Sequence, residues 1–347
     1  MGGAIGDALG APIEFMPISE IRSRFGTDGI TGYVEDGCKG KFTDDTQMAL
    51  FTAEGLLRAH HRTMRGLGYL ALPQIMYQSY LRWLYTQGMK SSYGIEKERL
   101  WLNGWLIEEK GLYSIRNPGK TCISALQTGK YGSIKEPINN SKGCGCVMRV
   151  APVGLFFSTS FEVGCEIAAI THGHPTGYLS AGCLALIIDL VLHGTSLISA
   201  VEKTLSALSK YDNHKECLDE INKAVEMSKT VKPTPENIEK LGSGFLAEEA
   251  LAISLYCALS YQDDFRKGVL AAVNHSGDSD TTGSITGNIL GTLLGEEAIP
   301  KEWAAGLELS GIVRRIASDL HDGLYVYPIG EYDSKSIQSW WSKYPMT

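Results

Sequence analysis

Two rows of glycine constrain the fold of this 347-residue chain more than any other feature of its sequence. Glycine recurs at every fourth position at the two ends of the chain, as Gly2, Gly6 and Gly10 and again as Gly283, Gly287, Gly291 and Gly295. In a helix this spacing places the glycines on one face, where each costs about 1 kcal/mol relative to alanine. A face without side chains lets two helix backbones approach closely. The rows therefore predict that the first helix packs tightly against a late helix at the centre of the fold; frayed, irregular helices are the alternative.

The rest of the sequence favours one all-α domain covering residues 1–347. Apolar residues recur at helical spacing in windows 44–59, 70–84, 163–170, 178–192, 198–208 and 246–260. Long strand-like alternations are scarce. Short breaks that contain Gly, Pro or Asn lie at 117–119, 173–177, 231–237 and 241–244. None of these breaks is long enough to indicate a linker between domains.

Composition and charge exclude several classes of protein. The chain is 44% apolar and 20% charged, which is typical of a globular protein. Its net charge of −7 and its scattered Lys and Arg argue against nucleic-acid binding. No apolar window approaches the roughly 20 residues that cross a bilayer, and the opening residues lack a signal peptide. Because the eight cysteines are also dispersed, we expect a cytoplasmic protein that binds neither nucleic acid nor membrane.

Two acidic motifs stand at predicted helix starts. The segment "FTDDTQ" (42–47) offers Thr43 as an N-cap, and in "NHSGDSDTTGSITG" (274–287) a helix is expected to begin near Thr282, after Asp280. Carboxylates in a first turn interact favourably with the positive end of a helix. Either motif alone is therefore as compatible with a simple helix start as with a functional site.

Taken together, the two motifs indicate a metal site. Clustered carboxylate and hydroxyl oxygens suit a hard divalent cation such as Mg²⁺ or Mn²⁺. If the glycine rows pack together, Glu14 comes near Asp278 and Asp280, and their mutual repulsion would require cations. An EF-hand calcium loop is excluded, because its twelfth position would be Ile289 where a bidentate Glu is needed.

Six ordered segments resemble the ADP-ribosylglycohydrolase family. They are "GGAIGDALGAPIEF" (2–15), "FTDDTQMAL" (42–50), "GCGCVMRVAPVGL" (143–155), "THGHPTGYLSAG" (171–182), "LGSGFLAEEAL" (241–251) and "SGDSDTTGSITGNILG" (276–291). The resemblance runs from Met1 to about Trp303. It implies a compact, orthogonal all-α bundle with two divalent ions, Mg²⁺ or Mn²⁺, in a central cleft.

The resemblance also implies roles for individual residues. The implied metal ligands are Thr43, Asp44, Asp45, Asp278, Asp280 and Thr281, and the implied catalytic acid or base residues are Glu14 and Asp45. The implied ADP-ribose-binding residues are Ser141, Gly143, Cys144, Gly145, His172, Gly244 and Phe245. Two of these have structural alternatives, since His172 could simply join two helices and Phe245 could belong to the core. We interpret Arg149 as an ion-pair partner and Asp7 as a buried, hydrogen-bonded residue that is not a ligand.

The expected function is a dinuclear-metal hydrolase that removes ADP-ribose from a modified protein side chain, with arginine as the favoured acceptor. The alternatives are hydrolysis of serine-linked or O-acetyl ADP-ribose, and a non-catalytic protein that binds ADP-ribose or an ADP-ribosyltransferase. The expected partners are an ADP-ribosylated protein and, for an antidote, the transferase itself. Residues 104–113 look like an insertion at the cleft rim, and 320–347 like a variable tail. The chain departs from the family at Cys144, where many relatives have Asn, and at Ser114, where some bacterial members have Asp.

Overall fold

The computed structural model describes the chain except for residues 35–38, 65, 67–71, 94–100, 324–334 and 346–347. The described residues form helices and no β-strand, and two isolated bridges join Gly40 to Leu307 and Gly143 to Leu246. The prediction of an all-α fold is confirmed.

The elements follow one another as short and medium helices. The α-helices are α1 (Gly2–Gly10), α2 (Ile18–Phe25), α3 (Asp44–Met64), α4 (Leu72–Thr86), α6 (Lys120–Gln127), α7 (Ala151–Gly154), α8 (Ser160–Ala169), α9 (Pro175–Leu192), α10 (Leu197–Leu208), α11 (Lys215–Thr230), α12 (Pro235–Ile238), α13 (Ala247–Ser260), α14 (Phe265–Val273), α15 (Ser279–Leu294), α16 (Lys301–Gly306), α17 (Ser310–Gly323) and α18 (Lys335–Lys343). The 3₁₀ turns are η1 (Ala11–Ile13), η5 (Leu106–Glu108), η6 (Lys110–Leu112), η7 (Cys144–Cys146), η8 (Glu239–Leu241) and η9 (Glu296–Ala298).

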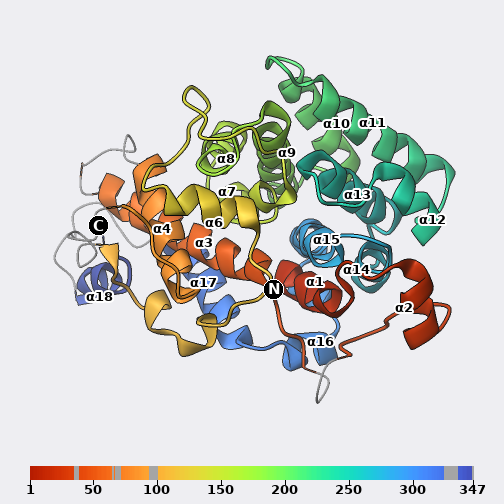
Figure 1. Cartoon of the computed structure of the whole chain (residues 1–347), viewed down its shortest axis with the longest axis horizontal. Coiled ribbons are helices and arrows are strands. Elements are labelled where there is room, and N and C mark those ends of the chain that lie inside the picture. The colour runs from red at the N-terminus through yellow and green to blue at the C-terminus, as the bar shows by residue number, and fades with distance from the viewer. Residues whose placement is uncertain (35–38, 65, 67–71, 94–100, 324–334, 346–347) are drawn as a thin grey trace.

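Helices α1 and α15, from opposite ends of the sequence, lie side by side near the middle of the molecule (Figure 1). Their glycine rows interlock. A Cβ atom placed on Gly6 would lie 1.9 Å from the carbonyl oxygen of Gly283, and one on Gly2 would lie 2.1 Å from that of Gly287. These distances leave no room for any side chain, so the predicted close packing is confirmed. Gly295 is different, because it has φ 78° and ends α15 instead of contacting α1.

The second half of the chain is built around α9, which packs against α8, α10 and α13. Among the described helices, α9 is the one long and apolar enough to cross a bilayer, so the expectation that no apolar window approaches that length was wrong. However, 72% of that stretch is buried inside the fold. Such burial is typical of a core helix.

The predicted helical windows coincide with α3, α4, α8, α9, α10 and α13. The first two residues of the window 70–84 lie outside the described residues. The expected start of α15 near Thr282 was wrong, since the helix begins at Ser279 with Asp278 as its N-cap. The physical reason is the sharp turn at Gly277 (φ 143°), after which the Asp278 N–H donates to the Ser243 carbonyl at 2.9 Å. Asp280 consequently lies in the first turn of the helix.

Residues 104–113 form the two turns η5 and η6, in which Leu106 and Leu112 are fully buried. Gly104 (φ 92°) lies directly against the Arg58 guanidinium, where a Cβ would be 2.2 Å from Nη2. This segment therefore packs as part of the core. That it is an insertion relative to other family members stays a prediction.

The described part of the C-terminal tail is docked on α3. Position 320 lies within α17, and the variability of 320–347 among relatives stays a prediction. The His61 ring makes T-shaped contacts with the rings of Trp340 and Tyr344, at centroid distances of 5.8 and 5.9 Å. The Tyr344 hydroxyl is buried and bonds to Asp319. Aromatic contacts thus hold the end of the chain against the helix that begins with the first acidic motif.

Candidate active site

Carboxylates from two distant parts of the chain meet where α1 and α15 pack together. Oxygen atoms of Glu14, Asp278 and Asp280 all lie within 4.8 Å of one another. The approach of α1 and α15 brings them together, since a Cβ on Gly10 would lie 2.3 Å from the backbone of Ser279. The Phe15 N–H then donates to the Gly277 carbonyl at 2.9 Å and holds the chain there. The predicted proximity of Glu14 to the last motif is confirmed.

Asp7 connects α1 to the start of α3. Its Oδ1 accepts the Thr43 N–H at 2.9 Å, and its Oδ2 accepts the Thr46 N–H at 3.0 Å and the Thr46 hydroxyl at 2.6 Å. These bonds use the N–H groups that a helix start leaves unsatisfied. The description of Asp7 as a buried, hydrogen-bonded residue is confirmed. By bonding to the start of α3, Asp7 places Asp44 and Asp45 beside α15.

Thr43 joins the two acidic motifs. Its hydroxyl accepts the Asp45 N–H at 3.3 Å, as expected of an N-cap, and also bonds to Asp280. Thr281, in the first turn of α15, donates its backbone N–H to Asp280 Oδ1 at 2.9 Å. The predicted ligands of both motifs therefore converge. We call the five carboxylates that meet here the acidic cluster: Glu14, Asp44, Asp45, Asp278 and Asp280.

The electrostatics of the acidic cluster are those of uncompensated negative charge. Burial, and next the charge of Asp280, raise the pKa of Glu14 to about 8. The same two causes raise the pKa of Asp45, and burial raises that of Asp44 although the Gly119 N–H donates to it. The described hydrogen bonds to Glu14, Asp44 and Asp278 come from neutral groups, which leave the charge in place.

The acidic cluster fits divalent cations. Asp45 Oδ1 is buried and has no hydrogen-bond partner among the described residues, which is costly for a carboxylate oxygen unless an ion binds it. In both acidic motifs, the atoms that could bind a metal are carboxylate or hydroxyl oxygens. These are the ligands that Mg²⁺ and Mn²⁺ prefer. The residues that could hold such ions are Thr43, Asp44, Asp45, Asp278, Asp280 and Thr281.

The glycine-rich loop at 141–145 lies against the acidic cluster. The Cys144 N–H donates to the Phe245 carbonyl at 2.9 Å, and its thiol donates to Asp278 Oδ2 at 2.9 Å. The Ser141 hydroxyl accepts the Gly143 N–H at 3.3 Å. Gly244 has φ 84°, and a Cβ there would lie 3.2 Å from the Asp278 side chain. The structure thus brings the predicted loop residues and Gly244 to the edge of the acidic cluster.

His172 is buried with one edge toward this loop. Its Nδ1 lies 2.8 Å from the Thr171 hydroxyl. A Cβ on Gly143 would be 3.6 Å from His172 Nε2, and one on Gly145 would be 3.5 Å away. Burial, and next the charge of Arg149, lower the pKa of His172 to about 3, so the ring is neutral. His172 is both a buried histidine and a neighbour of the glycine-rich loop.

Phe245 does not belong to the core. It is 40% exposed and stacks on Phe15, which is 60% exposed, with ring centroids 5.4 Å apart and an interplanar angle of 19°. The sequence prediction did not include Phe15. Its backbone is left-handed (φ 63°), which is unusual for an aromatic residue and aims the ring at Phe245. The available signal was an apolar side chain directly after Glu14.

The Asn-Pro-Gly turn at 117–119 was interpreted only as a helix break, yet it contacts the acidic cluster twice. Asn117 Nδ2 donates to Glu14 Oε2 at 3.0 Å, and the Gly119 N–H donates to Asp44 Oδ2 at 3.1 Å. The nearby Ser114 hydroxyl donates to the Gly111 carbonyl instead. No spacing in the sequence connects this turn to the acidic motifs.

The interpretation of Arg149 as an ion-pair partner was wrong. The guanidinium is fully buried and pairs with no carboxylate in the described part of the chain. It lies over the Tyr80 ring at 4.3 Å and donates from Nη2 to the Thr171 hydroxyl at 2.7 Å. A cation–π contact and neutral acceptors take the place of a carboxylate.

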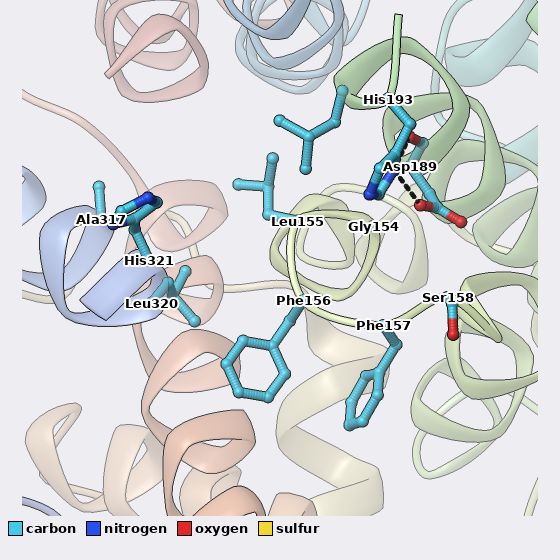
Figure 2. Close-up of a pocket in the computed structure, with 11 residues that line it drawn as sticks. Gly154, Leu155, Phe156, Phe157, Ser158, Asp189, His193, Ala317, Leu320 and His321 are labelled. Carbon is cyan, nitrogen blue, oxygen red and sulfur yellow. Dashed lines mark hydrogen bonds and ion pairs between the residues drawn. The ribbon is translucent and has the colours of Figure 1, made fainter. Parts of the chain in front are cut away.

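A cavity of about 550 Å³ lies elsewhere, between α7, the end of α9 and α17 (Figure 2). Its described lining is mostly apolar and includes Leu155 and Phe156, with Asp189 and His193 in contact at 2.9 Å on one side. No member of the acidic cluster lines it. The candidate active site is therefore the acidic cluster and not this cavity.

An all-α fold with a central acidic cluster beside a glycine-rich loop defines the class as a helical protein with a candidate metal site. The chain belongs to the ADP-ribosylglycohydrolase family, whose model matches residues 1–328. Members of this family are hydrolytic enzymes.

Two relatives and one solved structure illustrate the similarity. The chain is 25% identical to the ADP-ribosyl-[dinitrogen reductase] glycohydrolase of Rhodospirillum rubrum, over 89% of this chain and 88% of that protein. It is 24% identical to the ADP-ribosylarginine hydrolase Tri1 of Pseudomonas putida, over 93% and 76%. A solved "ADP-ribosylglycohydrolase-related protein complex" shares the fold with a TM-score of 0.55 at 24% identity, over 93% of this chain and 95% of that one.

Proposed function

We propose that the protein is a dinuclear Mg²⁺- or Mn²⁺-dependent hydrolase that removes ADP-ribose from modified arginine side chains of a protein. The observation that carries the proposal is the convergence of Glu14, Asp278 and Asp280 within 4.8 Å. The names of the Rhodospirillum and Pseudomonas relatives, a glycohydrolase and an ADP-ribosylarginine hydrolase, support the same reaction class.

The two aspartate motifs would hold the ions. When bound, divalent cations supply Lewis-acid chemistry and lower the pKa of a coordinated water. Asp7 and Thr43 fix the start of α3, so that Asp44 and Asp45 are held rigidly opposite α15. This preorganisation is what a hydrolytic site needs to orient a ribose and a water.

Glu14 and Asp45 are the proposed acid and base groups. Asn117 Nδ2 donates to Glu14 Oε2 and orients that carboxylate. Burial keeps a proton on Glu14 more readily than on an exposed glutamate, which suits a group that must give and take a proton near neutral pH. The backbone at Gly143 and Gly145, which have no side chain, suits the diphosphate, and the exposed Phe245 ring suits the adenine.

The charge of the acidic cluster favours arginine as the acceptor. Its five carboxylates and the adjoining Asp7 carry up to six negative charges when ionised, and two divalent cations carry four, which leaves negative charge in excess. A negative site attracts a cationic guanidinium and has no such preference for a neutral serine hydroxyl or an acetyl ester.

The test compares release of ADP-ribose from arginine-modified and serine-modified proteins and from O-acetyl-ADP-ribose. Each substrate is incubated with Mg²⁺, with Mn²⁺ and with EDTA, beside an Asp44→Ala/Asp280→Ala control. The proposal expects metal-dependent release from arginine that the control variant lacks.

The other outcomes lead to different assignments. Release from serine or from the ester alone would replace the arginine acceptor and keep the metal site. Retained ADP-ribose binding without release from any substrate would contradict the enzyme and favour a binding protein.

A further inference from the structure

A chain of hydrogen bonds leads from Arg149 to His172. Arg149 Nη2 donates to Thr171 Oγ1 at 2.7 Å, and Thr171 Oγ1 lies 2.8 Å from His172 Nδ1. All three side chains are buried. The backbone around them is also held, because Asn139 Nδ2 donates to the Thr171 carbonyl at 2.7 Å and Asn139 Oδ1 accepts the Gly173 N–H at 3.1 Å.

The direction of each bond follows from the chemistry of the donors. A guanidinium can only donate, so it occupies a lone pair of the Thr171 hydroxyl and turns the hydroxyl proton away from itself. Two groups could receive that proton, namely His172 Nδ1 and the Cys122 thiol, which also bonds to Thr171. A thiol sulfur is a weak acceptor, whereas the lone pair of a neutral imidazole is a strong one. Since His172 is neutral, the proton goes to its Nδ1.

We propose that Arg149 and Thr171 are positioning residues that fix His172 in the tautomer with its proton on Nε2, and so present an N–H donor to the glycine-rich loop. This inference rests on the proposed binding of ADP-ribose at that loop. The Nε2 edge faces Gly143 and Gly145. A diphosphate oxygen placed there can only accept a hydrogen bond, so the other tautomer would turn a lone pair toward it.

The hydrogen-bond chain from Arg149 to His172 also explains why the Arg149 guanidinium is buried without a carboxylate partner among the described residues. A carboxylate beside Thr171 would compete for the hydroxyl proton and draw it away from His172. The Tyr80 ring, at 4.3 Å from the guanidinium, stabilises the cation without accepting that proton.

The test replaces Thr171 by Val, which keeps the shape and removes the hydroxyl, and by Ser, which keeps the hydroxyl. The tautomer of His172 is read from the ¹⁵N NMR shifts of its ring nitrogens, with the signal assigned from a His172→Gln variant. ADP-ribose affinity is measured by calorimetry, and kcat and KM are measured separately on the arginine-modified substrate.

We expect wild type and Thr171→Ser to show the proton on Nε2. Thr171→Val should lose the fixed tautomer and bind ADP-ribose about 10- to 100-fold more weakly, the range for one hydrogen bond to a charged group. The loss should lie mainly in KM, because His172 contacts the loop and not the acidic cluster.

The spectrum of the wild type decides the tautomer of His172 even if the Thr171 variants do not fold. A proton on Nδ1 of wild-type His172, or unchanged affinity in Thr171→Val, would overturn the inference and leave the proposed function standing. Wild-type protein that has the proton on Nε2 but does not bind ADP-ribose would instead overturn the proposed function, and the ligand half of this inference with it.

Discussion

Helix α3 contains buried carboxylates in two opposite electrostatic environments. At its start, Asp44 and Asp45 face other carboxylates, and burial followed by like charges raises the pKa of Asp45. In its middle, Glu54 accepts Arg58 Nη2 at 2.9 Å and Arg82 Nε at 2.8 Å. Burial alone would raise the pKa of Glu54, but the two guanidinium groups lower it below its ordinary value.

The comparison teaches that countercharge, and not burial, separates a structural carboxylate from a functional one. Glu54 forms ion pairs with both Arg58 and Arg82, and these pairs stabilise the contact between α3 and α4. The acidic cluster is left with excess negative charge that the described protein groups do not balance. Carboxylates that repel one another in this way are kept where the binding of an ion offsets the unfavourable electrostatic energy. Four predictions test this difference.

The largest expected effect is on activity. Asp280→Asn removes the carboxylate that, after burial, contributes most to the raised pKa values of Glu14 and Asp45, and should lower kcat/KM by about 10³-fold or more, because a proposed metal ligand is lost. The free energy of unfolding of the metal-free variant should not fall, since a like charge disappears. Steady-state kinetics and denaturant unfolding in EDTA measure both. A large loss of stability in EDTA would show that Asp280 is structural, as Glu54 is.

The reverse is expected for Glu54→Gln. Two buried guanidinium groups lose their countercharge, so the free energy of unfolding should fall by about 3–5 kcal/mol. Activity per folded molecule should stay within about twofold. The matched control is Glu20→Gln, which breaks an exposed pair with Arg24 and should cost under about 1 kcal/mol. Equal losses for the two variants would remove the contrast between the regions.

Gly6→Ala tests what brings the acidic cluster together. A methyl group there meets the Gly283 carbonyl, so the helices must separate, at about 1–3 kcal/mol or more. Because Asp7 and Glu14 move with α1, Mn²⁺ affinity should also fall, which isothermal titration measures. Gly311→Ala in α17 is the control, since nothing lies near it and alanine should stabilise the helix by up to about 1 kcal/mol. Normal Mn²⁺ binding by Gly6→Ala would contradict the role of the glycine rows.

The smallest effect is a dependence of metal-free stability on pH. Burial, and next Asp280, raise the pKa of Asp7 to about 7 and that of Glu14 to about 8. An unfolded chain releases these protons near pH 4, whereas the folded chain keeps them, so stability should fall as the pH rises from about 4 to about 8. Mg²⁺ should restore more stability at pH 8 than at pH 6, because it replaces the missing protons. Glu54 contributes with the opposite sign, below about pH 4.5, where its stabilisation is lost as the pH falls.

Thermal unfolding in EDTA, at several pH values and with and without Mg²⁺, measures this dependence. Glu14→Gln is the matched variant, because it removes one of the carboxyl groups whose pKa is raised and should flatten the profile. A wild-type melting temperature that does not change between pH 5 and pH 8 in EDTA would contradict the electrostatic account of the acidic cluster.

Much of the fold could be predicted from local patterns. The glycine rows predicted the packing of α1 on α15, and the apolar spacing predicted helices such as α3 and α13. The start of α15 was misplaced because a contact with Ser243, far away in the sequence, sets it. A single domain, a cytoplasmic location and a transferase partner stay predictions.

The site was predictable where its residues lie in motifs and not where it depends on the path of loops. Asn117 and Phe15 were missed because their contacts arise from segments that meet only in space. The role of Arg149 was mistaken because a sequence does not show whether a buried cation faces a carboxylate or a hydroxyl.

By itself, the sequence determined the helical class, the close approach of two helices and the oxygen chemistry of the two motifs. These follow from short-range rules of spacing and residue type. Only the tertiary structure decided which carboxylates lack a countercharge and which side chain hydrogen-bonds to His172. Electrostatic energy depends on distances between residues far apart in the chain, and folding alone sets those distances.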